Sequence, residues 1–117
     1  SHQNPIPNAS RIGNIVMSSI MNGSDPGTRT VPPELARQVT NIFKHIALCI
    51  EAAGGTADDI IKINFWMKQP STGRAALNEE WVKMFPDAAS RPARHTLQLS
   101  PDSPHEVTCD FTAVIGA

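Results

Sequence analysis

The order of apolar and polar positions predicts strands first, then two helices that alternate with further strands. Residues Ile12 to Met21 are dense in apolar side chains and are followed by the turn-forming run Asn22 to Gly27. Such a block, bounded by turn residues, is typical of a strand. We consider a hairpin partner for it near residues 28 to 32.

Two segments repeat their apolar residues at steps of three and four, which is helical spacing. Pro32-Pro33-Glu34 opens the first, because proline fits a first turn and glutamate suits the positive end of the helix dipole; Gly54-Gly55 ends it. The second follows the break Gln69 to Gly73, and Pro86 closes it. Their expected buried stripes are Leu35, Val39, Ile42, Phe43, Ile46, Cys49, Ile50 and Ala53, and Leu77, Trp81, Met84, Phe85 and Ala88.

Three later segments alternate with the two-residue period of strands. They are Ile60 to Lys68, Arg94 to Leu99 and Val107 to Ile115. The first is expected to point Ile61, Ile63, Phe65 and Met67 to one face. The last is expected to point Val107, Cys109, Phe111, Ala113 and Ile115 one way and Thr108, Asp110 and Thr112 the other.

This order predicts a single α+β domain over residues 1–117, in which both helices pack on one face of a mostly antiparallel sheet. The second face should also carry apolar residues, for which we take Val16, Ser18, Ile20 and Ile60. A face too apolar for water is covered most simply by other copies of the chain, so we expect a homo-oligomer.

Composition narrows the class of partner and the compartment. A net charge of −1 with 5% aromatic residues offers no basic patch and few stacking platforms, which disfavours nucleic acid. Cys49 and Cys109 stand in apolar contexts without CxxC spacing, as expected of free thiols in the reducing cytoplasm. No apolar run is long enough for a membrane span, and no signal-peptide pattern opens the chain.

The segment Ser90 to His95 carries the main chemical hypothesis. It places Arg94 at the start of a strand, and an arginine held there can grip a small organic acid through two parallel hydrogen bonds to its carboxylate. The alternative is that Arg91 and Arg94 are surface arginines beside a proline turn.

Three segments resemble the RidA/YjgF family, the reactive-intermediate imine deaminases also labelled L-PSP endoribonucleases. These are residues 52–63, with Gly54-Gly55 before Asp58-Asp59, residues 77–86, with Asn78 before an aromatic residue and a Phe-Pro, and residues 91–96, with Pro92-Ala93-Arg94. The likeness covers nearly the whole chain. It implies a chorismate-mutase-like α+β fold and a homotrimer with three ligand sites in the clefts between subunits.

The resemblance also implies roles for individual residues. Arg94 corresponds to the arginine that binds the substrate carboxylate, Asn78 to a pocket asparagine and Ser19 to a serine that lines the cleft. The chain departs from the family where a glycine is replaced by Ile20 and a cysteine by Thr96, whose backbone would hold the imine or water. The family's N-terminal tyrosine is absent, and Asn78 as a plain helix-surface residue remains the alternative.

The water-orienting acid is the largest departure. The family members that hydrolyse imines usually carry a glutamate on the last strand, and Thr108 stands at that place here. Asp110 is two residues further on the same face, about 6 to 7 Å away at the usual rise per residue. Asp110 is thus the candidate acid, Glu106 a weaker one, and a structural ion pair of Asp110 with a basic side chain is the alternative reading.

With these residues, the resemblance implies an enamine/imine deaminase that releases ammonia from a small 2-imino or dienamine acid. Arg94 would bind the carboxylate while Asp110 or Thr108 orients water, and no metal or organic cofactor is needed. His2, His45, His95 and His105 lack ligand spacing and are interpreted as structural. Two other functions stay open: a trimer that binds small carboxylates without turnover, and RNA cleavage, which the charge disfavours.

Overall fold

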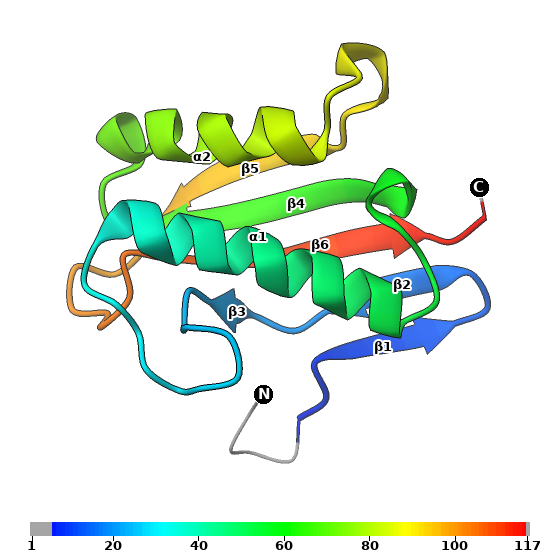
Figure 1. Ribbon diagram of the computed structural model, residues 1–117, viewed down its shortest axis with the longest axis horizontal. Coiled ribbons are helices and arrows are strands. Elements are labelled where there is room, and N and C mark those ends of the chain that lie inside the picture. The colour runs from blue at the N-terminus through cyan, green and yellow to red at the C-terminus, as the bar shows by residue number, and fades with distance from the viewer. Residues whose placement is uncertain (1–5, 117) are drawn as a thin grey trace.

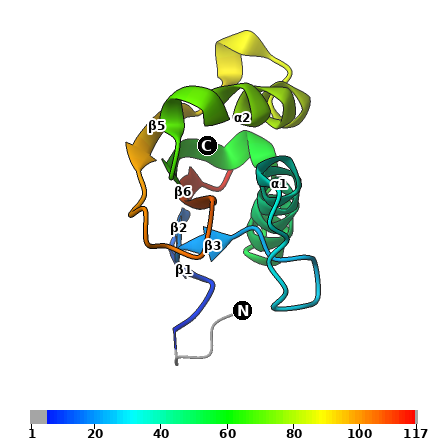
Figure 2. The ribbon, with the colours of Figure 1, turned by 90° about the vertical axis from the view of Figure 1, so that its left-hand side faces the viewer.

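The computed structural model describes residues 6–116 and consists of two layers, a sheet and a pair of helices that cover one of its faces (Figures 1 and 2). The strands run in the order β1-β2-β6-β4-β5, with β3 also paired to β6. Among these described residues, only the β4–β5 pairing is parallel. The elements are β1 (Ala9–Ile12), β2 (Ile15–Ser18), β3 (Met21–Asn22), α1 (Leu35–Ala52), β4 (Ile60–Met67), α2 (Pro70–Met84), β5 (Ala93–Gln98) and β6 (Val107–Val114), with short 3-10 turns at Ala57–Asp59 and Ala88–Ser90.

The core lies between the helices and the covered face of the sheet. Phe65 in β4 is its centre, stacked on Phe43 of α1 and in edge contact with Trp81 of α2. Around it the buried residues of β6 and the two helices form one cluster. The helical stripes and the alternation of β6 are therefore as the sequence predicts, with two kinds of exception. Ala88 is exposed in the turn after α2, and five residues are only partly buried: Leu35, Cys49, Ala53, Met84 and Ile115.

The N-terminal apolar block is not one strand. Gly13, at φ 58°, turns the chain between β1 and β2, and β3 is a separate short strand. The segment expected as a hairpin partner, residues 28–32, is a loop. The apolar pattern did not predict this turn, because apolar residues stand on both sides of it. The turn is a two-residue hairpin loop, Gly13-Asn14, and glycine favours such a loop because it readily adopts a left-handed backbone conformation.

The face assignments need a second correction. Val16 and Ile60, expected on the second face, are buried beneath the helices, whereas Ile61 is 51% exposed. A register shift between Ile60 and Lys62 inserts one residue into β4 and so exchanges the faces of the residues before it. The second face is nevertheless apolar, because Ile15, Met17 and Leu97 are exposed large hydrophobic residues.

The break at residues 69–73 is also corrected, because α2 already begins within it, at Pro70. Proline at the first helical position lacks only a hydrogen bond that the helix would leave unmade anyway. By contrast, β4, β5 and β6 begin and end within one residue of the expected positions. These are the strands that place the candidate site.

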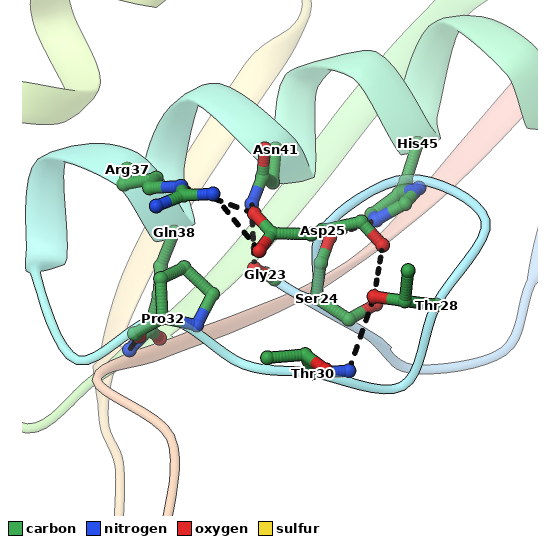
Figure 3. A network of polar contacts seen from close by, with 10 residues as sticks. All are labelled: Gly23, Ser24, Asp25, Thr28, Thr30, Pro32, Arg37, Gln38, Asn41 and His45. Atoms are coloured by element: carbon green, nitrogen blue, oxygen red, sulfur yellow. Dashed lines mark hydrogen bonds and ion pairs between the residues drawn. The ribbon is translucent and has the colours of Figure 1, made fainter.

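A polar network fixes the loop between β3 and α1 (Figure 3). The amide of Asn41, on α1, donates to the backbone oxygen of Gly23 at 3.0 Å and to the carboxylate of Asp25 at 2.9 Å. Arg37 grips the same carboxylate with two hydrogen bonds. Gly23 is required at this place, because a Cβ would come within 2.6 Å of the backbone of Gln38.

Candidate functional site

Arg94 lies on β5, at the edge of the sheet and on its helix-covered face. It is in register with the buried Ile63 of β4, and its guanidinium carbon is 5.0 Å from the centre of the Trp81 ring. This contact is a cation–π interaction, which holds the guanidinium plane while leaving its edge available. Arg94 is therefore half-buried at the boundary between β5 and α2, not a loose surface arginine.

The electrostatic setting of Arg94 favours an anion. Burial first, and the positive charge of Arg74 second, lower the pKa of Arg94 from its ordinary value. Arginine still stays protonated in proteins, so the site keeps a cation that is partly stripped of water. Within residues 6–116, no hydrogen bond or ion pair engages the Arg94 side chain.

Asn78 and Thr96 lie close to Arg94 along the same boundary. Asn78 is exposed on α2 one turn before Trp81, so both follow one side of the helix. Thr96 is two residues after Arg94 in β5, opposite the buried Phe65, and so lies on the same sheet face. The structure thus places Asn78 on α2 and places Arg94 and Thr96 on β5, the strand along which α2 lies (Figure 1).

Asp110 and Thr108 lie on the other face of the sheet. Asp110 is paired in register with Asn64, whose amide donates to the Asp110 carboxylate at 3.0 Å. Thr108 is only 7% exposed. The ion pair considered for Asp110 is absent from the described part of the chain, since its partner is this neutral amide. A single chain does not bring these residues together with Arg94.

Ser19 and Glu106 are engaged elsewhere. The hydroxyl of Ser19, between β2 and β3, donates to the backbone oxygen of Pro7 at 2.7 Å. The carboxylate of Glu106, just before β6, lies 3.7 Å from the ammonium of Lys68. Glu106 is therefore a poor candidate for the acid, because its charge is already paired.

The three histidines of the described chain form no metal site. His45 Nε2 lies 2.7 Å from the backbone oxygen of Ser24, His95 is exposed, and His105 keeps a buried Nδ1 without a partner; His2 lies outside the described residues. From residue 6 to residue 116, no three His, Cys, Asp or Glu side chains gather in a way that could hold a metal ion. In the same range, no helix is long and apolar enough to cross a membrane.

A cleft of about 800 Å³ opens between α1, β1, β3 and the loop after β3, away from the predicted residues. None of the seven candidate residues lines it: Ser19, Asn78, Arg94, Thr96, Glu106, Thr108 and Asp110. The structure also identifies Arg74 beside the Arg94 boundary, which the sequence interpretation missed. The sequence does contain a sign of it. Arg74 stands one helical turn before Asn78, and the residues three and four positions after it, Leu77 and Asn78, are not acidic and cannot form an ion pair with it.

Comparison with known proteins agrees with this fold. The family model described as Endoribonuclease L-PSP matches residues 3–110. A RutC family protein of Haemophilus influenzae is 29% identical over 94% of this chain and 85% of its own length. RidA from an Antarctic Psychrobacter is 28% identical with a TM-score of 0.85, covering 98% of this chain and 92% of its own. The YjgF gene product of E. coli, 23% identical, shares the fold at a TM-score of 0.82 over 97% and 90% of the two chains.

Proposed function

The chain belongs to the Endoribonuclease L-PSP family, which is the RidA/YjgF family that its sequence resembles, and we propose that it is an enamine/imine deaminase. Its substrates would be reactive 2-imino acids, which it hydrolyses to 2-keto acids and ammonia. The observation that carries the proposal is the guanidinium of Arg94, which lies against Trp81 on β5 and has no ion pair among residues 6–116. Such a group binds and orients the carboxylate beside the imine carbon.

The reaction needs little beyond this anchor. Water adds to the carbon of the C=NH group, forming a C–O bond, and the nitrogen gains protons and leaves as ammonia while the carbon–oxygen bond becomes the ketone. Arg94 fixes the substrate by its carboxylate, and backbone groups near Thr96 hold the imine or water. A carboxylate that orients water and transfers one proton then accelerates the step, for which Asp110 is our candidate.

Because Arg94 and Asp110 occupy opposite sheet faces, we propose that the two come from different subunits of a homotrimer. Arg94 lies at the β5 edge, whereas Asp110 lies on the second face, the face that also carries the exposed Ile15, Met17 and Leu97. An apolar face of this kind is a suitable contact for another copy. The edge of one subunit would then meet the second face of its neighbour, and a cleft between them would contain both groups.

A second candidate function is a trimer that binds small carboxylates without turning them over. It is favoured by Thr108, a neutral buried side chain where the family carries an acid, and by the hydrogen bond of Asp110 to Asn64. Both observations leave Arg94 as a binding group but weaken the acid. The two functions therefore predict the same affinity for 2-keto acids, but only the deaminase accelerates the hydrolysis of imino acids.

The decisive experiment measures ammonia and 2-keto acid release from an imino acid that an amino acid oxidase generates in the assay. We expect the wild type to exceed spontaneous hydrolysis, and Asp110→Asn to reduce the acceleration about 100-fold while keeping 2-keto acid affinity. Lys83→Gln, an exposed change on α2, should leave the rate unchanged. A wild type that binds 2-keto acids without accelerating hydrolysis would replace the deaminase proposal with the binding function.

A further inference from the structure

A second guanidinium, that of Arg74, belongs to the same boundary as Arg94. Arg74, Asn78 and Trp81 are separated by four and then three residues in α2, so they follow one stripe along the helix. Trp81 ends that stripe over the guanidinium of Arg94, 5.0 Å away. Burial first, and the positive charge of Arg74 second, lower the pKa of Arg94, as expected of a second cation on this side of α2.

No acid of the described chain neutralises this pair of cations. The ion pairs among residues 6–116 join Arg37 to Asp25, Lys68 to Glu106 and Lys83 to Glu80. Within α2, the positions three and four residues after Arg74 are Leu77 and Asn78, which cannot pair with it. The first turn of α2 has no acidic residue either. The positive end of the helix dipole therefore adds to the positive charge of Arg74, which lies near that end.

We propose that Arg74 binds a second carboxylate of the substrate, so that the site selects dicarboxylic over monocarboxylic 2-imino acids. The inference rests on the proposed function, because Arg94 is taken to hold the carboxylate beside the imine. Two like charges near each other repel, and the repulsion is relieved when a dianion lies between them. Asn78, which stands between Arg74 and Trp81 on the stripe, is placed to donate to either end of such a ligand.

The experiment compares two 2-keto acids of equal chain length by calorimetric titration of the assembled protein. One is 2-oxoglutarate, with a second carboxylate; the other is 2-oxopentanoate, with a methyl group in its place. We expect the wild type to bind 2-oxoglutarate about tenfold more tightly. Arg74→Gln should remove this preference while leaving 2-oxopentanoate affinity unchanged, and Arg74→Lys should restore part of it because the charge returns without the fork.

Lys83→Gln is the matched control, since it removes one positive charge from α2 nine residues away, on the opposite side of the helix. Lys83→Gln should keep the full preference for 2-oxoglutarate. This result would show that the preference comes from a contact with Arg74 and not from the total positive charge of α2. Equal affinities in the wild type, or a preference that survives in Arg74→Gln, would overturn the role of Arg74 alone. Binding of neither acid, or binding unchanged in Arg94→Gln, would overturn the Arg94 site and this inference with it.

Discussion

Arg94 and Asp110 lie on opposite faces of the sheet. Arg94 is in register with the buried Ile63 and contacts Trp81 on the helix side, whereas Asp110 is in register with Asn64 on the other side. Successive strand residues point to opposite faces, so Ile63 and Asn64 fix the two directions. One substrate held by Arg94 is therefore out of reach of Asp110 in the same chain. A shared reaction requires a neighbouring subunit.

The first prediction concerns that assembly. Light scattering of the wild type should give about three times the chain mass of 12.6 kDa. Met17→Glu should shift it toward the monomer, because a carboxylate at an apolar contact is costly to bury. Met17 is 58% exposed in the single chain, so the fold itself should tolerate the change. Leu48→Glu, the same kind of change on the helix layer, should keep the trimer; a monomeric wild type would contradict the prediction.

The second prediction separates charge from geometry at Arg94. Arg94→Gln should weaken 2-keto acid binding at least about 30-fold, since truncating one partner of a desolvated charge pair costs roughly 2 kcal/mol or more. Arg94→Lys should fall between this variant and the wild type, because lysine keeps the charge but loses the two-pronged fork and the stacking on Trp81. Calorimetric titration measures all three. Equal affinities of the glutamine variant and the wild type would place the carboxylate site elsewhere.

Much of the fold follows from periodicity because its longer elements bury one face each. The stripe of α2 and the alternation of β6 required nothing but spacing, and the ends of β5, the strand of Arg94, were predicted to within one residue. The errors lie where a single residue interrupts the alternation of a strand, so that the residues on its two sides no longer follow one pattern. The bulge at Ile61 exchanged the expected faces at the start of β4, and the Gly13 turn was hidden inside an apolar run.

The candidate site could be predicted only in part, for a different reason. Alternation within β5 groups Arg94 with Thr96, and alternation within β6 groups Asp110 with Thr108. Which face of the sheet each group occupies depends on the register of both strands with β4, and the sequence carries no direct signal for that register. Arg74 was not among the predicted residues, because the reason to propose it is its charge near Arg94 on another element, which its own helix does not reveal.

The third prediction compares two polar contacts of the loop after β3. Asn41→Ala should lower the free energy of unfolding by about 1 to 3 kcal/mol, because the buried Gly23 carbonyl loses its donor. Arg37→Ala should cost about 1 kcal/mol or less, since the Arg37 side chain is 60% exposed and its ion pair with Asp25 is screened by water. Urea unfolding at one protein concentration measures both. The reverse order would contradict this account of the network.

The fourth prediction follows from His105. Burial first, and the charge of Lys68 second, lower the pKa of its imidazole in the folded protein. The unfolded chain then binds more protons than the folded one between the folded value and the ordinary one. Stability therefore rises with pH across that interval and is lost as pH falls below about 6.5. His105→Asn should reduce this loss in urea unfolding at several pH values. Identical pH dependences of variant and wild type would refute it.

The last prediction tests whether Arg94 and Asp110 act across subunits. Arg94→Gln and Asp110→Asn should each lose nearly all acceleration of imino acid hydrolysis when pure. Unfolded together in equal amounts and refolded, they form mixed trimers in which some sites take an intact Arg94 from one chain and an intact Asp110 from its neighbour. With random assembly in a cyclic trimer, about a quarter of all sites are of this kind. We therefore expect about a quarter of the wild-type rate.

This recovery has a single structural cause, because neither variant contains both groups in one chain. If Arg94 and Asp110 served a site within the same subunit, no mixed trimer would hold an intact site and the mixture would stay as inactive as its components. Refolded wild type, carried through the same steps, sets the reference rate. We expect recovery because Arg94 is in register with Ile63 and Asp110 with Asn64. Ile63 and Asn64 are successive residues of β4 and point to opposite faces, so Arg94 and Asp110 point away from each other within every chain.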